Sequence, residues 1–359
     1  MIFNKSTNGA VETKELLGFI YKSNNFENLL TYVTIAERDI KRVIGPEVFK
    51  LAENHYQSDD YQVTPVPETT PDPQLVLLDE LVRLIQLPVI LNAYRRFAPL
   101  NDLSHSEAGR LITVTDQQKP AFEWMLTRDN ASLLDLAHEA TDLLLEWLDE
   151  QVPIPYVPTQ EALTGEATAN TIEDTWRSSA TYSALKDLFI NSAREFDYIF
   201  PINASRRLYL ALVPFIREVE LRYIRPVIGS TRYDLIRELI KDEELDLTGD
   251  SNDPNVADNT ESKEIYELSK VPVVLLTMSV ALKRLPVELL PDAVVQSFMA
   301  MDVKQSKPAL SSDRIAVSSL LERDGRRELI PLQNYIIALL PVAPVVEETT
   351  DTTQSFFMS

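Results

Sequence analysis

The hexapeptide IKRVIG at residues 40–45 returns as IRPVIG at residues 224–229, an offset of 184 (224 − 40). The same offset places ELVRLIQLPVIL (80–91) on EIYELSKVPVVL (264–275). Five positions are then identical, namely Glu80, Leu84, Pro88, Val89 and Leu91 against Glu264, Leu268, Pro272, Val273 and Leu275. One register held across two motifs and the segment between them predicts a tandem duplication.

A third match extends the repeat with a shifted register. LTRDNASLLDL (126–136) resembles LERDGRRELIP (321–331) at an offset of 195 (321 − 126), which implies an insertion of 11 residues (195 − 184) in the second copy. The acidic stretches 56–74 and 242–262 then occupy equivalent places and are expected to be exposed loops.

The repeated motifs also predict local geometry. Gly45 and Gly229 follow the last apolar positions of their helices, where a helix C-cap is expected. Pro88 and Pro272 lie inside apolar helical stretches, so each helix is expected to kink, or to break and restart.

The fold class predicted from periodicity is mainly α. Residues 205–229 and 131–150 both repeat their apolar residues at helical spacing. GRLITVT (109–115) and DRIAVSS (313–319) have β character and are expected to form a small β-hairpin in each half. The predicted organisation is a first helical module (1–150), a Pro-rich acidic linker (151–175), a second helical module (176–346) and a flexible C-terminal tail (347–359).

Composition limits the classes of function. The 359 residues carry a formal net charge of −21 and contain no cysteine, 8 glycines and 22 prolines. Tight nucleic-acid binding needs clustered Lys and Arg, so a chain this acidic is expected to stand beside DNA without gripping it. Scarce glycine disfavours Gly-rich phosphate loops. We expect no secretory signal, because no basic stretch precedes an apolar run, and no segment long and apolar enough to span a membrane.

Motifs that carry chemistry are missing. The sequence contains no GxxxxGK[ST], GxGxxG, GxSxG or HExxH. We therefore predict no enzymatic activity, no catalytic residues, no metal site and no cofactor. The best metal candidate is Asp135, His138, Glu139 and Asp142, at helical spacing, but a solvated face opposite a leucine stripe explains it better.

Two further histidine contexts favour structural interpretations. His55 is expected to be a solvated surface residue at a helix end. The cluster Asp102, Ser104 and His105 is expected to form a turn and the cap of the next helix, because a catalytic triad depends on spatial geometry and not on adjacency in sequence.

Two sets of residues are candidates for protein–protein contact. One gives a long helix a basic side that is expected to meet an acidic partner, including an acidic loop of a neighbouring copy: Arg206, Arg207, Arg217, Arg222 and Arg225. The other is the apolar tip of the acidic, Thr-rich tail, expected to insert into a groove on a neighbouring subunit or partner: Phe356, Phe357 and Met358. A frayed tail is the alternative.

Residues 176–229, from WRSSATY to IRPVIG, resemble the signature region of an uncharacterised family of Bacteroidetes phage and prophage structural proteins. Each half also resembles the small helical head–tail adaptor (connector) proteins of tailed phages. The first half matches with IKRVIG followed by AYRRF (93–97), whereas the second has VALKRL (280–285) and lacks the tyrosine. No catalytic residue is carried over.

What the resemblance implies is a virion structural protein. It would form a homo-oligomeric ring at the portal or neck, contacting the portal protein and other neck and tail proteins. DNA would pass through the ring without sequence-specific binding, and the particle would be assembled in the cytoplasm of the bacterial host. A helical-repeat scaffold that binds another protein without forming a ring is the alternative, and a metal-dependent enzyme using Asp135 and His138 is a third.

Overall fold

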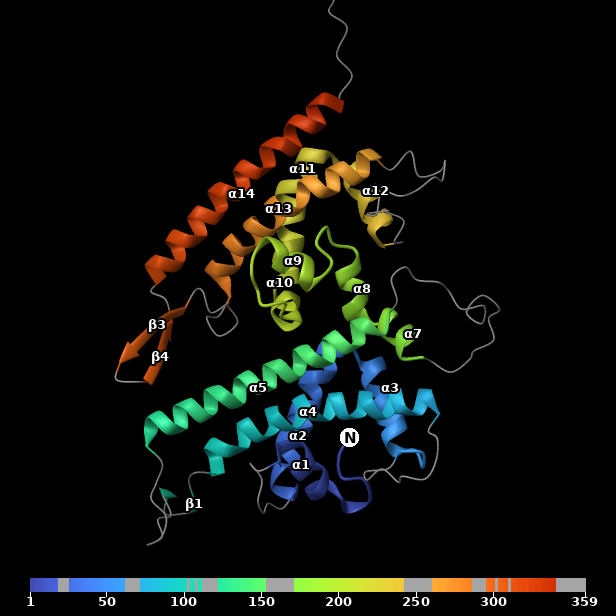
Figure 1. The fold of residues 1–359 in the computed structure, drawn as a ribbon, viewed down its shortest axis with the longest axis vertical. Coiled ribbons are helices and arrows are strands. Elements are labelled where there is room, and N and C mark those ends of the chain that lie inside the picture. Colours follow the sequence, from blue (N-terminus) through green and yellow to red (C-terminus); the bar gives the residue numbers. More distant parts are fainter. Residues whose placement is uncertain are drawn as a thin grey trace, which may run out of the picture.

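The structure is a computed structural model. It describes residues 1–18, 26–61, 72–101, 104–106, 109–111, 122–152, 171–241, 260–285, 295–300, 303–308 and 311–339. Within these ranges the chain is mainly helical, which confirms the predicted fold class at that level (Figure 1). The candidate tail residues Phe356, Phe357 and Met358 lie outside the described residues.

The first half of the chain contains long helices joined by shorter elements. In chain order these are η1 (Lys5–Thr7), α1 (Gly9–Leu17), α2 (Phe26–Ile44), α3 (Pro46–Gln57), α4 (Pro73–Asn101), β1 (Ser104–Ser106), β2 (Gly109–Leu111) and α5 (Glu123–Glu150). β1 and β2 pair antiparallel, with His105 opposite Arg110.

The second half begins with short helices and ends with two long ones. In chain order these are α7 (Ile172–Arg177), α8 (Ala180–Lys186), α9 (Ala193–Ile199), α10 (Arg206–Val219), η3 (Glu220–Ile224), α11 (Arg225–Ile228), α12 (Ser230–Lys241), α13 (Thr260–Arg284), β3 (Val295–Ala300), β4 (Val303–Pro308) and α14 (Ser311–Leu339). β3 and β4 pair antiparallel, with Ser297 opposite Ser306.

Amphipathic spacing explains why these segments are helical. In α2 the buried residues Leu29, Val33, Ala36 and Ile40 recur every three or four positions, so they share one face. In α10 the buried residues Leu208, Leu212, Ile216 and Val219 do the same. Each helix therefore buries one stripe against its half of the protein and leaves its polar side to solvent.

Buried side chains form two hydrophobic clusters. The first gathers residues from Ile2 to Val152 and also takes Ile172, Trp176 and Tyr182. The second runs from Leu188 to Ile336. Figure 1 shows the same division, with α1–α5 in the lower part of the view and α9–α14 in the upper part. The hydrophobic clusters thus change over between Tyr182 and Leu188.

Gly45 and Gly229 end their helices as predicted. The Gly45 amide donates to Lys41 O at 3.1 Å, and the Gly229 amide donates to Arg225 O at 3.0 Å. Both glycines have positive φ, with φ/ψ of 90°/150° and 85°/152°. This conformation is closed to residues with a Cβ atom, so each site requires glycine where the chain turns into the next helix.

Pro88 and Pro272 do not interrupt their helices. α4 continues through Pro88 and α13 through Pro272, so neither helix breaks and restarts. Pro88 has no N–H to donate to the Leu84 carbonyl one turn earlier, and the Asn92 side-chain amide donates to the Pro88 carbonyl at 2.9 Å.

Four expectations from the sequence are wrong. Residues 313–319 are helical and belong to α14, where the buried Ser318 hydroxyl donates to the Ser279 carbonyl of α13 at 2.8 Å. Ser104 and His105 lie in strand β1 and not at a helix cap. His55 is buried, with its Nε2 atom 2.7 Å from Asp79 Oδ1. α13 is also long and apolar enough by composition to cross a membrane, but most of that stretch is buried inside the protein.

The glycine conformations generate the first prediction. Gly229→Ala should lower the free energy of unfolding by about 1–3 kcal/mol, because a Cβ atom is strained at this φ although it would meet no other atom. Gly45→Ala should cost at least as much, since its Cβ atom would also lie 3.3 Å from the Cβ atom of Ser179. Urea unfolding measures both, with the neighbouring Ser230→Ala as the control. Unchanged stability in Gly229→Ala would contradict the assigned backbone conformation.

Candidate functional site

The chain makes an unusual turn directly after α10. Residues Glu220–Ile224 (η3) form a π-helical turn between α10 and α11. Such turns are rare and are frequent at functional sites. The Glu220 side chain is fully buried, whereas Arg222 is 62% exposed, so the turn directs one charged group into the core and another to the surface.

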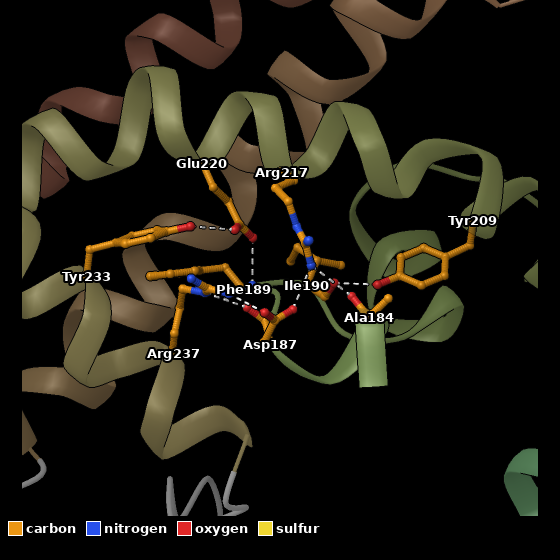
Figure 2. A network of polar contacts seen from close by, with 9 residues as sticks. All are labelled: Ala184, Asp187, Phe189, Ile190, Tyr209, Arg217, Glu220, Tyr233 and Arg237. Carbon is orange, nitrogen blue, oxygen red and sulfur yellow. Dashed lines mark hydrogen bonds and ion pairs between the residues drawn. The ribbon is translucent and has the colours of Figure 1, made fainter. Parts of the chain in front are cut away.

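The inner face of the turn is a polar network in the second core (Figure 2). Glu220 Oε1 accepts the Phe189 amide at 2.7 Å, and Glu220 Oε2 accepts the Tyr233 hydroxyl at 3.0 Å. The Phe189 ring stacks on Tyr233 with centroids 5.5 Å apart. One carboxyl group therefore ties the segment before α9 to both α10 and α12.

Charged residues continue this network toward the surface. Asp187 Oδ1 accepts from Arg217 at 2.9 Å, and the Asp187 carboxylate also pairs with Arg237. Arg237 Nε donates to the Asp187 carbonyl at 3.1 Å. The Tyr209 hydroxyl donates to the Ile190 carbonyl on the same segment. Residues 187–190 are thus held by side chains from α10, η3 and α12.

Burial is the main influence on Glu220. It raises the pKa of the carboxyl group from 4.5 to about 7, although the hydrogen bonds from Phe189 and Tyr233 act in the opposite direction. Glu220 lines neither of the two cavities described below. Its geometry suits a structural bond that changes protonation near neutral pH, and not a group that reacts with a substrate.

The outer face of the turn borders a pocket of about 200 Å³ between η3, α13 and α14. We call this the basic pocket. Four cationic side chains line it, namely Arg222, Lys283, Arg284 and Arg326, together with Tyr223 and Glu322. The cations come from three separate elements, so only the fold brings them together.

Two carboxylates pair with these four cations. Glu218 accepts from Arg284 at 2.5 and 3.2 Å and lies 3.9 Å from Arg222. Glu322 pairs with Lys283 at 3.2 Å and with Arg326 at 3.0 Å. These cations lower the pKa of both carboxyl groups, so both are charged at neutral pH. Counting only these groups, four positive charges face two negative ones.

The halves meet where α10 begins against α5. Asp142 accepts from the Ser205 hydroxyl at 2.8 Å and from the Arg207 amide at 2.6 Å, so it caps the N-terminus of α10. Asp149 accepts from Arg206 at 3.1 Å and from Trp176 Nε1 at 3.2 Å. Carboxylates of the first half thus fix the first turn of the second half's long helix.

A cavity of about 510 Å³ opens beside this contact. Its lining combines apolar side chains with charged groups, of which Arg206 pairs with Asp149 and with Glu146 at 3.3 Å. The Lys186 ammonium group lies 5.0 Å from the centre of the Tyr182 ring. The contacts of Asp149, Arg206 and Trp176 in this lining join α5 to α7 and α10.

The five arginines predicted to form one basic side have separate environments. Arg206 and Arg207 lie at the junction, and burial lowers the pKa of Arg207. Arg217 pairs with Asp187. Arg225 stacks over Tyr233 with its guanidinium 5.8 Å from the ring centre. Of the five, Arg222 lines the basic pocket, where its partners come from parts of the chain distant in sequence.

The candidate metal residues do not converge. Asp142 is used as the cap of α10. Burial and the charges of Arg207 and Arg95 lower the pKa of His138 to about 4, so cations surround this imidazole. Within the described ranges, no three His, Asp or Glu side chains are arranged to hold a metal ion.

One surface feature was missed by the sequence analysis. The first part of α5 is exposed on all sides, including Phe122 just before it (67%), Trp124 (50%), Met125 (41%) and Leu126 (38%). Figure 1 shows this end of α5 extending away from the body of the protein. Helical periodicity alone does not reveal that none of the described elements covers it.

Comparisons with family models, with curated proteins and with solved structures find no match to this chain. Inference about function therefore rests on the residues and their geometry.

The buried carboxyl group predicts a distinctive dependence of stability on pH. Glu220 retains its proton in the folded protein at pH values where the unfolded chain has released it. The free energy of unfolding should therefore fall, by up to about 3 kcal/mol, as pH rises from about 4.5 to about 7. Glu220→Gln, which imitates the protonated form, should remove most of this decrease in urea unfolding measured across that range.

Glu218→Gln is the matched control for this experiment, because Arg284 lowers the pKa of Glu218 and the group is exposed. The control should keep the decrease between pH 4.5 and 7. An unchanged profile in Glu220→Gln would show that the buried carboxyl group is not the cause.

The cap of α10 provides a second test. Asp142→Ala should lower stability by about 1–2 kcal/mol, because it leaves the Arg207 amide and Ser205 hydroxyl without their acceptor at a helix N-terminus. Asp135→Ala, an exposed change on the same helix, should have little effect. Thermal melting compares the two, and equal melting temperatures would contradict the capping role.

Proposed function

We propose that this chain is a non-enzymatic assembly protein built by duplication of one helical module, and that it forms a ring with copies of itself. Its resemblance to head–tail adaptors leads to a specific role, a ring at the portal or neck of a tailed-phage virion. The neighbours proposed on that basis are the portal protein and other neck and tail proteins, and the ring is assembled in the bacterial cytoplasm.

The order of elements supports the duplication. In each half a long helix ends at a glycine of positive φ, a 12-residue helix follows (α3 or α12), and a long proline-containing helix comes next (α4 or α13). An antiparallel strand pair then precedes the last long helix, α5 or α14. Gly45 and Gly229 differ by only 5° in φ and 2° in ψ (90 − 85 and 152 − 150).

A pair of similar contacts gives independent support. Glu37 on α2 accepts the Ile2 amide at 2.9 Å, just as Glu220 accepts the Phe189 amide. These glutamates are 183 residues apart (220 − 37), one fewer than the offset of the following motif. The π-helical turn supplies that extra residue, because a π turn inserts one residue into an otherwise regular helix.

The observation that carries the ring proposal is the exposed apolar end of α5. Soluble monomers rarely expose contiguous apolar patches, and such patches mark contact sites. The occupant we propose is a second copy of the chain. An exposed patch that meets a different surface of the next copy makes a head-to-tail contact, and such contacts form a ring when the rotation from copy to copy closes.

The acidic character is compatible with this role. A net charge of −21 repels DNA, so a duplex passing through a ring would not adhere to its wall. The helical scaffold that binds another protein without forming a ring is the competing function. It shares the exposed apolar end, and the state of association separates the two.

Assembly is tested by light scattering and negative-stain electron microscopy of the full chain. The wild type should form closed rings with a central hole. The double variant Trp124→Ser, Met125→Ser should be monomeric with an unchanged circular dichroism spectrum, because both side chains are exposed within one copy. Asp129→Asn, on the same exposed turns, should assemble normally. A wild type that stays monomeric at high concentration would contradict the ring and favour the scaffold.

A further inference from the structure

The basic pocket concentrates positive charge on the surface of a strongly acidic chain. We propose that it binds a carboxylate-rich peptide segment, and that the segment is residues 242–259 of a second copy. This inference rests on the proposed self-association, because the two partners are copies of one chain.

The basic pocket has a surplus of positive charge. Four cations line the pocket, and the two carboxylates that pair with them leave two positive charges unbalanced within the group. Arg222 is the least engaged, since its nearest carboxylate oxygen is 3.9 Å away. Arginine favours carboxylates, because its planar fork of N–H donors matches their geometry.

Two arginines of the basic pocket are held in place before a ligand binds. The guanidinium of Arg222 lies 5.5 Å from the centre of the Tyr223 ring, and that of Arg326 lies 5.3 Å from the same centre. Contacts with an aromatic ring restrain long side chains before a ligand arrives. Less conformational entropy is then lost on binding, so an arginine held in this way binds an anion more strongly than a free one.

Folding of the module does not require these charges. At the duplication offset of 184, Lys283 and Arg284 correspond to Pro99 and Leu100. At the later offset of 195, Glu322 and Arg326 correspond to Thr127 and Ala131. The equivalent module therefore builds the same helices without this cluster. Because exposed ion pairs add little stability, the cluster calls for an explanation outside the chain's own fold.

The proposed occupant of the basic pocket is an acidic segment of the chain. Residues 242–259 contain seven acidic side chains and no Lys or Arg: Asp242, Glu243, Glu244, Asp246, Asp250, Asp253 and Asp258. The spacing of carboxylates along such a segment allows several to meet cations from three different elements. Duplex DNA is the other common polyanion, but a chain with net charge −21 repels it as a whole.

Geometry favours a second copy over the same copy. The segment is anchored at α12 and at Thr260, so its 18 residues (259 − 242 + 1) reach at most about 30 Å when doubled back fully extended. Along α13, Leu276 and Ser279 of the pocket lie about 24 and 29 Å from Thr260 and Arg284 about 36 Å, so the same copy reaches the near side of the pocket but not its Arg284 end. A neighbouring copy has no such limit.

The experiment uses the full chain and a fluorescently labelled synthetic peptide of residues 242–259, with binding followed by fluorescence anisotropy. The wild type should bind this peptide, and affinity should fall as salt concentration rises. The double variant Arg222→Gln, Arg326→Gln should bind about tenfold more weakly. The matched control Arg323→Gln, Arg327→Gln removes the same charge from exposed positions of α14 outside the pocket, and should bind like the wild type.

Three results would overturn the inference: no peptide binding by the wild type at low salt, equal weakening in both double variants, or tighter pocket-dependent binding of an 18-base-pair DNA duplex than of the peptide. A peptide with the seven acids changed to amides should not bind. Peptide binding does not require a ring. Rings that form without peptide binding therefore refute this inference alone, and a monomer that binds the peptide refutes the ring alone.

Discussion

The burial of one carboxyl group, that of Glu220, constrains much of the second half. A carboxyl group removed from water is tolerated only if its oxygens have hydrogen-bond partners. Glu220 finds them in the Phe189 amide and the Tyr233 hydroxyl, which fixes the approach of the segment before α9 and the position of α12. The same π-helical turn that directs Glu220 inward places Arg222 outward toward α13 and α14. One π-helical turn therefore positions both a buried carboxyl group and an exposed guanidinium group.

The two halves use similar devices but differ in what they present. Both turn at a glycine of positive φ, and both tie a backbone amide near their beginning to a glutamate on the long helix. The first half contributes carboxylates that cap and pair with α10, together with an exposed apolar end of α5. The second contributes the basic pocket. Two halves whose surfaces differ in this way have unlike faces to offer a neighbouring copy.

Polar groups at the junction hold the two halves together. Hydrogen bonds of ordinary length join α5 to α10 through Asp142, Asp149 and Arg206. His138 is beside cations that keep it neutral. These residue types are common in active sites, but here their contacts connect the two halves of the protein. Among the described residues, the apolar end of α5 and the basic pocket are two surfaces from which function is expected.

The helical class, the glycine turns and the amphipathic faces were predictable from the sequence, because they depend on local spacing and on backbone freedom at single residues. The positions of Gly45 and Gly229 are examples, since only glycine adopts their φ values without strain. Predictions from local sequence pattern were wrong where residues distant in sequence decide the structure. Residues 313–319 have β character yet extend α14, and His55 is buried against Asp79 although its neighbours in sequence are polar. The basic pocket was out of reach for the same reason: Arg222, Lys283 and Arg326 are separated by tens of residues, and only the packing of α13 and α14 beside the π-helical turn brings their charges together.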